Sequence, residues 1–152
     1  MEISTGGLDR DDVLALLREH LADMHATSPP GSVHALDVAG LRIPSVTLWT
    51  VRESEVLLGC GALKELSATE GEVKSMRTSV AARGRGAATA VLGRIVEEAR
   101  LRGYHRLSLE TGTQDFFAPA WQLYERHGFV ACGPFGDYVA DPHSRFLTLS
   151  LR

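Results

Sequence analysis

A glycine-rich turn holds the residues of this chain whose types and spacing most clearly suggest chemistry. The run Arg83-Gly84-Arg85-Gly86 follows a strand-like stretch that begins at Glu72, and a helical pattern starts at Ala87 and Ala88. A turn between a strand and a helix aims several free backbone N–H groups at one point, where the helix dipole adds positive charge. Arg83 and Arg85 add further positive charge to the turn. The turn therefore predicts a binding site for a phosphate-bearing ligand.

Two common phosphate ligands fit this turn poorly. A nucleoside triphosphate loop requires the pattern G-x-x-x-x-G-K-S/T, which the sequence lacks. A dinucleotide site requires G-x-G-x-x-G within several parallel strand–helix–strand units. Here Thr89 stands where the third glycine belongs, and only one such unit, residues 72–111, is evident. Both ligands are therefore disfavoured on the residues alone.

The strand–helix–strand unit around the turn must position it. Glu72 to Thr78 is predicted to be a strand, Ala88 to Ala99 carries an apolar stripe at helical spacing, and Arg106 to Thr111 alternates as a second strand. Gly103 follows the helix at the place where a left-handed residue commonly ends one. Such a unit predicts two parallel strands joined by a right-handed crossover.

The segments on either side predict further helices and strands. A helix is expected from an N-cap at Asp9 to about Ala26, and a short helix at residues 38–41 capped by Asp37. Strands at residues 46–51 and 56–66 should form an antiparallel meander with the strand from Glu72. Gly59 and Gly61 predict a bulge or a close backbone approach there. A helix at residues 119–127 and strands at 129–132 and 146–151 complete the pattern.

The composition limits the fold and the partners. The chain has 152 residues, of which 44% are hydrophobic and 23% charged, so residues 1–152 are expected to form one domain. The formal net charge of -3 argues against non-specific binding to nucleic acid. No apolar run reaches the ~18 residues that span a bilayer and no secretion signal is visible, so a cytoplasmic protein without a membrane partner is expected. No His or Cys spacing is typical of a metal site.

Two motifs at a matching distance resemble those of the GNAT acetyltransferase superfamily. Residues 83–88 fit the pattern Q/R-x-x-G-x-G/A, which marks that family's pyrophosphate loop. Residues 120–129 resemble its A-x-x-L-Y-x-x-x-G-F segment, and residues 72–78 and 107–111 resemble the strands before and after the loop. The resemblance implies an α+β (mixed α/β) fold of three layers. An antiparallel N-terminal meander would join two splayed parallel strands in a mixed central sheet, with helices on both faces.

The resemblance also implies acetyl-CoA as the acyl donor, and no metal. Its pantetheine arm would pair with the backbone at Met76 and Thr78, and its pyrophosphate would rest on the turn. Splayed strands suit an amide-bearing arm because they leave N–H and C=O groups unpaired. The implied cofactor-binding residues are Met76, Thr78, Arg83, Gly84, Arg85, Gly86, Ala87 and Ala88.

Acetyl transfer to an amine requires that the ammonium lose a proton and that the departing thiolate gain one. Tyr124 matches the family's tyrosine near the thioester sulfur, which implies the role of general acid. Glu72 starts the strand before the loop, where several members place a base, and is the expected base here. Glu110, which ends the opposite strand, is the rival, and His34 is third.

The resemblance implies that the acceptor is a primary amine of a small molecule or a peptide, which attacks the thioester directly. His34, Glu110 and Phe117 are the candidate acceptor-binding residues. Phe117 stands where members often carry an asparagine that contacts the pantetheine region, and it could wall the cofactor or the acceptor pocket or pack in the core. The alternative function is a non-catalytic acyl-CoA-binding sensor or interaction module. Folds of this kind are also compatible with a homodimer.

Overall fold

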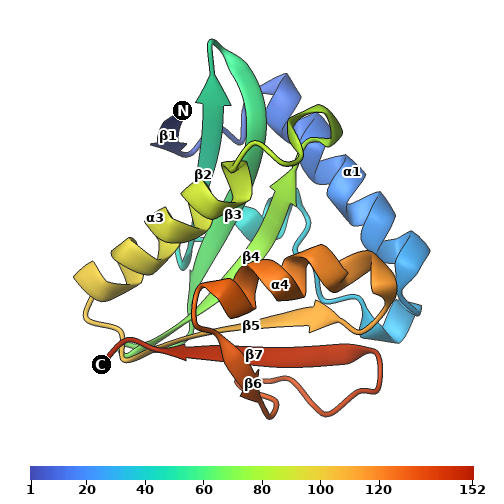
Figure 1. Cartoon of the computed structure of the whole chain (residues 1–152), viewed down its shortest axis with the longest axis vertical. Coiled ribbons are helices and arrows are strands. Elements are labelled where there is room, and N and C mark those ends of the chain that lie inside the picture. Colours follow the sequence, from blue (N-terminus) through green and yellow to red (C-terminus); the bar gives the residue numbers. More distant parts are fainter.

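A seven-stranded mixed sheet forms the centre of the computed structural model, which describes residues 1–152 (Figure 1). The strands are β1 (Glu2–Thr5), β2 (Val46–Glu53), β3 (Val56–Glu65), β4 (Glu70–Thr78), β5 (Arg106–Gly112), β6 (Val130–Cys132) and β7 (Ser144–Ser150). The α-helices are α1 (Asp11–Thr27), α2 (Val38–Leu41), α3 (Ala87–Leu101) and α4 (Ala118–Arg126), with 3-10 turns at Pro30–Ser32, Val80–Ala82 and Asp115–Phe117. None of these helices has both the length and the apolar sequence that crossing a membrane requires.

The sheet has one parallel strand pair among antiparallel neighbours. Its strand order is β1-β2-β3-β4-β5-β7-β6, and only β4 and β5 pair in parallel. The connection between these two strands is α3, because parallel neighbours need a crossover rather than a hairpin. The meander from β2 to β4 and the strand–helix–strand unit after it are therefore confirmed.

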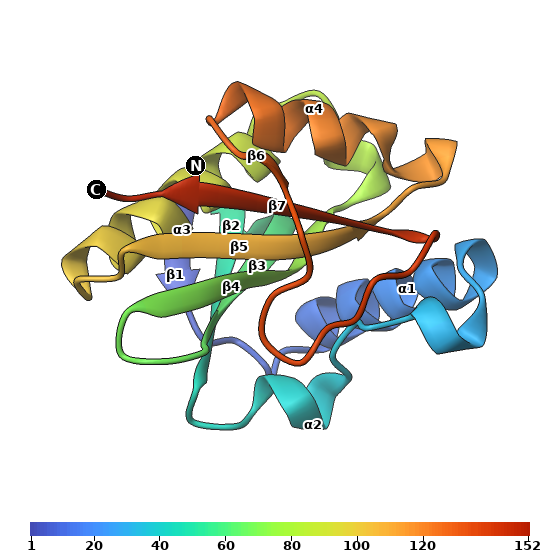
Figure 2. The same ribbon diagram turned by 90° about the horizontal axis from the view of Figure 1, so that it is seen from below.

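Helices cover both faces of the sheet, with α3 and α4 on one side and α1 and α2 on the other (Figure 2). Successive residues of a strand point to opposite faces, so Leu63 of β3 joins the first layer and Ala62 the second. The α3 and α4 layer buries Leu92, Ile95 and Leu123 against Leu107, and the other layer buries Val13, Leu17 and Leu41 against Leu48. The predicted three-layer mixed α/β fold is confirmed.

The parallel strands β4 and β5 separate soon after they pair. Ladder pairs join Glu70–Glu72 of β4 to Arg106–Ser108 of β5, and none follows. On its other edge β4 stays paired with β3 as far as Thr78. The stretch from Val73 to Thr78 therefore has a backbone edge with no strand beside it.

A bulge in β4 accompanies this separation. Ser75 has a φ of 54°, in the left-handed region, and the β3–β4 register shifts between Cys60 and Ala62. The predicted close backbone approach is confirmed at Gly59, where an added Cβ would lie 2.7 Å from the Arg77 carbonyl oxygen. At Gly61 the register shift confirms the predicted bulge, and an added Cβ would meet side chains, with Met76 Sδ at 2.5 Å. Bulges bend strands, which is consistent with β4 leaving β5.

The cap of α1 differs from the prediction. Arg10, not Asp9, occupies the N-cap position, and no side chain caps the helix. The Asp9 carboxylate instead accepts a hydrogen bond from Arg42 Nη2 at 3.2 Å on the protein surface. The cap predicted for α2 is confirmed, because Asp37 Oδ1 accepts from the Gly40 N–H at 2.8 Å.

Candidate active site

A cavity of about 660 Å³ opens where β4 and β5 separate. Its walls come from both strands, the glycine-rich turn, the start of α3, the segment that leads into α4, and the C-terminal half of α1. All but two of the site residues named from the sequence line it: His34, Met76, Thr78, Arg83, Gly84, Gly86, Ala87, Ala88, Glu110, Phe117 and Tyr124. The exceptions are Glu72 and Arg85.

The glycine-rich turn presents unpaired donors at the start of α3. The N–H groups of Gly84, Gly86, Ala87 and Ala88 donate to no backbone carbonyl. Gly84 and Gly86 have φ values of 78° and 84°, and nothing lies within 4 Å of a Cβ built on either. The turn therefore requires glycine for its left-handed backbone rather than for space within the protein. These groups can bind an anion at a helix N-terminus.

The two arginines of the turn lie in different places. Arg83 lines the cavity. Arg85 points away, with Nη2 3.0 Å from Glu53 Oε1 in an ion pair whose partners are both about half exposed. Such surface pairs contribute little to stability. Arg83 is thus the arginine of the turn that can contact an anion in the cavity as it stands.

Tyr124 lies on the cavity face of α4. Its side chain is buried, its ring meets Phe129 edge-on at 5.7 Å between centroids, and its hydroxyl makes no hydrogen bond within the chain. Burial, with a smaller contribution from the Glu110 charge, raises the pKa of Tyr124 well above its usual value. Tyr124 therefore remains a protonated phenol that can donate a hydrogen bond or a proton.

Glu110 of β5 has an unusual carboxyl environment in the same cavity. Its Oε2 is buried and has no hydrogen-bond partner. Burial raises its pKa to about 7, the charges of Glu72 and Asp141 add to this shift, and the Lys74 ammonium and the nearby Ser144 hydroxyl oppose it. A carboxyl that titrates near neutral pH can accept a proton under physiological conditions.

Glu72 lies behind the cavity wall in a buried network. Tyr138 Oη donates to Glu72 Oε2 at 2.5 Å. Lys74 Nζ donates to the same carboxylate oxygen at 3.3 Å, to Tyr138 Oη at 2.9 Å and to the His34 carbonyl at 3.1 Å. The Glu72 carboxylate is thus ion-paired and hydrogen-bonded, whereas the Glu110 carboxylate is not.

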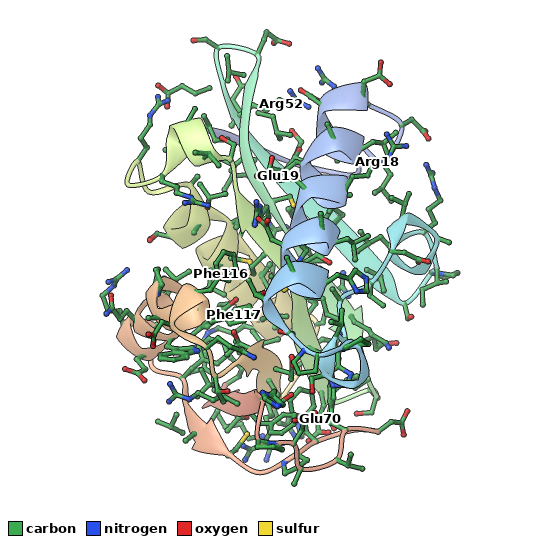
Figure 3. The ribbon with its side chains drawn as sticks, turned by 90° about the vertical axis from the view of Figure 1, so that its right-hand side faces the viewer. Arg18, Glu19, Arg52, Glu70, Phe116 and Phe117 are labelled. Carbon is green, nitrogen blue, oxygen red and sulfur yellow. The ribbon has the colours of Figure 1, made fainter.

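Aromatic side chains surround the rest of the cavity. The His34 ring meets the Tyr138 ring edge-on at 5.0 Å between centroids. Phe117 is buried and meets Phe116 in the same way at 5.1 Å. Figure 3 shows Phe116 and Phe117 together on the segment that leads into α4. Phe116 remains 43% exposed, so the aromatic lining continues to the protein surface.

Sequence reasoning did not single out Lys74 or His20, which both line the cavity. Lys74 was within reach, since residues two apart on a strand share a face and Glu72 was already named. Tyr138 lies in a loop without periodicity, so no local pattern could place its hydroxyl against Glu72. His20 lies on the buried face of α1, where burial lowers its pKa to about 4 and keeps it neutral. No group of three or more His, Cys, Asp or Glu side chains is placed to hold a metal ion.

Comparison with known sequences identifies close relatives. The sequence profile of the Acetyltransferase (GNAT) family matches residues 13–129. The chain is 50% identical to the uncharacterized N-acetyltransferase YsnE of Bacillus subtilis, over 99% of this chain and 100% of the relative. It is 52% identical to the uncharacterized N-acetyltransferase YedL of Escherichia coli, over 98% of this chain and 94% of the relative. It is 37% identical to an IAA acetyltransferase of Azospirillum brasilense, over 91% of this chain and 90% of the relative.

Comparison with solved structures finds the same fold. A Klebsiella pneumoniae protein assigned as an acyl-CoA N-acyltransferase matches with a TM-score of 0.79 and 25% identity, over 99% of this chain and 97% of that one. A GNAT family acetyltransferase from Elizabethkingia anophelis, solved with acetyl-CoA bound, matches with a TM-score of 0.72 and 15% identity. The match covers 99% of this chain and 97% of that one.

Proposed function

The chain belongs to the GNAT family of acetyltransferases, and on that premise we propose that it moves an acetyl group from acetyl-CoA to a primary amine. The acceptor is an amine of a small molecule or a peptide, which attacks the thioester directly. One arrangement carries the proposal. The anion-binding turn, the open edge of β4, Tyr124 and Glu110 all border the same cavity.

The cavity has groups that suit each part of coenzyme A. The free N–H groups from Gly84 to Ala88, together with Arg83, would hold the pyrophosphate. The open β4 edge at Met76 and Thr78 would pair with the amides of the pantetheine arm. Arg85 would join them only by leaving Glu53. Bound acetyl-CoA would supply the acetyl group as an activated thioester.

Tyr124 is the proposed general acid. Its raised pKa keeps the phenol protonated, and its hydroxyl, which has no partner within the chain, is free to donate to the departing sulfur. Because the same burial disfavours a free thiolate charge, the proton would pass to the sulfur as the C–S bond breaks. Phe117, which lines the cavity next to the start of α4, would provide an apolar wall beside the reacting groups.

Glu110 is the proposed base, in preference to Glu72. A base must be free to receive the proton, and the unpartnered Glu110 oxygen together with its pKa of about 7 supports that role. The Glu72 carboxylate already accepts from Tyr138 and Lys74 and does not line the cavity. Glu72 would then act through its charge on Glu110. His34 would contribute to the acceptor pocket rather than to proton transfer.

A thiol-release assay tests the proposal. The purified chain is incubated with acetyl-CoA and a panel of aliphatic amines, aromatic amines, amino acids and short peptides, and free thiol is measured over time. We expect at least one amine to raise thiol release well above acetyl-CoA hydrolysis. Thermal stabilisation by CoA without turnover on any amine would contradict the proposal and favour a non-catalytic sensor.

A further inference from the structure

Three buried polar groups in the cavity lining have no partner within the chain. They are His20 Nδ1 of α1 and, in β4, Ser75 Oγ and Arg77 Nε. Each of these residues is only 8% exposed, so bulk water does not satisfy the three atoms. A buried polar group without a partner costs free energy, so these groups need a ligand or an ordered water.

Arg77 keeps donors free although it forms two ion pairs. Glu19 and Asp23 of α1 both bind its Nη2, so Nε and Nη1 take part in neither pair (Figure 3 shows Glu19 on α1). Neither acid lines the cavity, and their side chains are 46% and 37% exposed, so water screens their charges. Arg77 can therefore still bind an anion that enters from the cavity.

The three groups lie close together and can all donate hydrogen bonds. The Arg77 charge adds to burial in lowering the pKa of His20 to about 4, so the imidazole is neutral and can carry its proton on Nδ1. Ser75 precedes Arg77 by two residues in β4. A guanidinium, a hydroxyl and an imidazole N–H together suit a carboxylate, whose two oxygens accept several hydrogen bonds and which arginine binds well.

The charges of the cavity lining also leave room for a carboxylate. The cations are Lys74, Arg77, Arg83 and Arg126, and Glu110 is the single carboxylate. Lys74 already donates to three groups of the chain. Arg83 belongs to the glycine-rich turn and Arg126 to the last turn of α4. Arg77 is thus the cation beside α1 that has donors left for an acceptor.

Glu110 and Arg77 lie on the same side of the sheet. Leu107 and Leu109 of β5 belong to the apolar layer under α3 and α4. Side chains alternate along a strand, so Glu110 points to the other face, where α1 lies. Arg77 is on that face too, because its ion pairs are with α1. One small molecule in the cavity can therefore contact both side chains.

We propose that the acceptor carries a carboxylate as well as its primary amine, and that Arg77 binds this carboxylate. This inference rests on the proposed function. Ser75 and His20 donate to the same carboxylate. The ammonium lies beside Glu110, whose charge attracts it and which then accepts its proton. Amines without a carboxylate leave the three donors unpaired and are therefore poor acceptors.

Matched substrates test the inference on the unmodified protein. The kcat/KM for acetyl transfer is measured for γ-aminobutyrate and n-propylamine, β-alanine and ethylamine, and phenylalanine and phenethylamine. The members of each pair differ only by the carboxylate. We expect the carboxylate to raise kcat/KM about tenfold or more in the best pair, because a charge-assisted pair with arginine is gained. A smaller ratio in every pair would overturn the inference.

The same panel separates this inference from the proposed function. Transfer to n-propylamine or ethylamine that is as fast as transfer to the matched amino acid, in every pair, would overturn the carboxylate site and leave acetyl transfer standing. No transfer to any amine would overturn both.

Arg77→Gln removes the proposed carboxylate ligand. We expect the ratio of kcat/KM in the best pair to fall to about one, because glutamine has no charge to pair with the carboxylate. Circular dichroism checks that the variant is folded. A ratio that stays at its original value would contradict the role of Arg77.

Glu19→Gln tests the same site with the guanidinium in place, and applies even if Arg77→Gln does not fold. The substitution removes one charge that competes for Arg77, so the ratio in the best pair should rise about threefold. Asp11→Asn is the matched control, since Asp11 is an exposed acid of the same helix, roughly 12 Å along it from Glu19. If Arg77 only fastened α1 to β4, Glu19→Gln would lower Tm and leave the ratio unchanged, which would contradict the inference.

Discussion

Two carboxylates of one site differ because their partners differ. Glu72 accepts hydrogen bonds from Tyr138 and Lys74, so its Oε2 is already used within the protein. Glu110 has a buried oxygen without a partner, and burial raises its pKa to about 7. A carboxyl that is free of partners and titrates near neutral pH is the one suited to proton transfer.

The pH dependence of kcat/KM tests the assignment of the base. Glu110 must be ionised to accept a proton, so activity should fall as the pH drops below about 7. Glu110→Gln removes the group, so we expect kcat to fall by about 100-fold or more and this acidic limb to disappear. An acidic limb that survives in Glu110→Gln would contradict the assignment.

Glu72→Gln is the matched control for that profile. Removal of the Glu72 charge takes away one contribution that raises the pKa of Glu110. We therefore expect the acidic limb to persist and to shift toward lower pH. Loss of the limb in Glu72→Gln would instead identify Glu72 as the base.

Tyr124→Phe tests the general acid. The substitution keeps the ring packed against Phe129 and removes only the hydroxyl, which has no structural hydrogen bond to lose. We expect kcat to fall by about 100-fold and KM for acetyl-CoA to change little, since proton donation acts in the transition state. Steady-state kinetics at saturating amine give both values, and an unchanged kcat would remove Tyr124 from the mechanism.

The element that distinguishes this sheet is β4, whose open edge leads into the glycine-rich turn and α3. Gly86 begins the helix with a φ of 84°, and Gly93 lies within α3 with nothing within 4 Å of an added Cβ. Ala at Gly86 must adopt a left-handed conformation, whereas Ala at Gly93 keeps the helical one.

The variants Gly86→Ala and Gly93→Ala therefore test whether the glycine-rich turn binds the cofactor. Gly86→Ala should raise the KM for acetyl-CoA at least about tenfold, because the N–H groups lose their alignment. Gly93→Ala should leave KM unchanged and stabilise the fold by roughly 0.5–1 kcal/mol. Kinetics and thermal unfolding of both variants provide the measurement, and equal KM values would contradict the role of the turn.

The features that the sequence could predict depend on residues close together in the chain. The strand, the turn and α3 follow from residues that are neighbours in the chain, and so does the Asp37 cap of α2. The cap of α1 was predicted one residue too early, since Arg10 occupies the N-cap position and no local pattern favoured it over Asp9. The contact from Tyr138 to Glu72 joins segments 66 residues apart and depends on the β7 connection, so no periodicity encodes it. Burial of Glu110 likewise needs the assembled layers.

At the scale of the whole molecule, the two helical layers share the strands between them. Trp49 belongs to the apolar cluster under α3 and α4, and its neighbour Leu48 to the cluster under α1 and α2. Neither layer has its own sheet, which supports the expectation that residues 1–152 form one domain. The homodimer and the cytoplasmic location stay predictions.

Unfolding should therefore be a single cooperative transition that near-UV and far-UV circular dichroism report together. CoA at about 100 times its Kd should raise Tm by roughly 5–10 °C, because a ligand that binds only the folded state stabilises it. Two separate transitions, with only one shifted by CoA, would indicate two folding units instead of one.

The most direct measurement of the central claim follows the acetyl group itself. The chain is incubated with acetyl-CoA that carries an isotope label in the acetyl group, together with the amine panel, and the amines are analysed by mass spectrometry. We predict a labelled amide on the amine nitrogen, with one thiol released for each amide formed. CoA binding without a labelled amide on any amine would contradict the account.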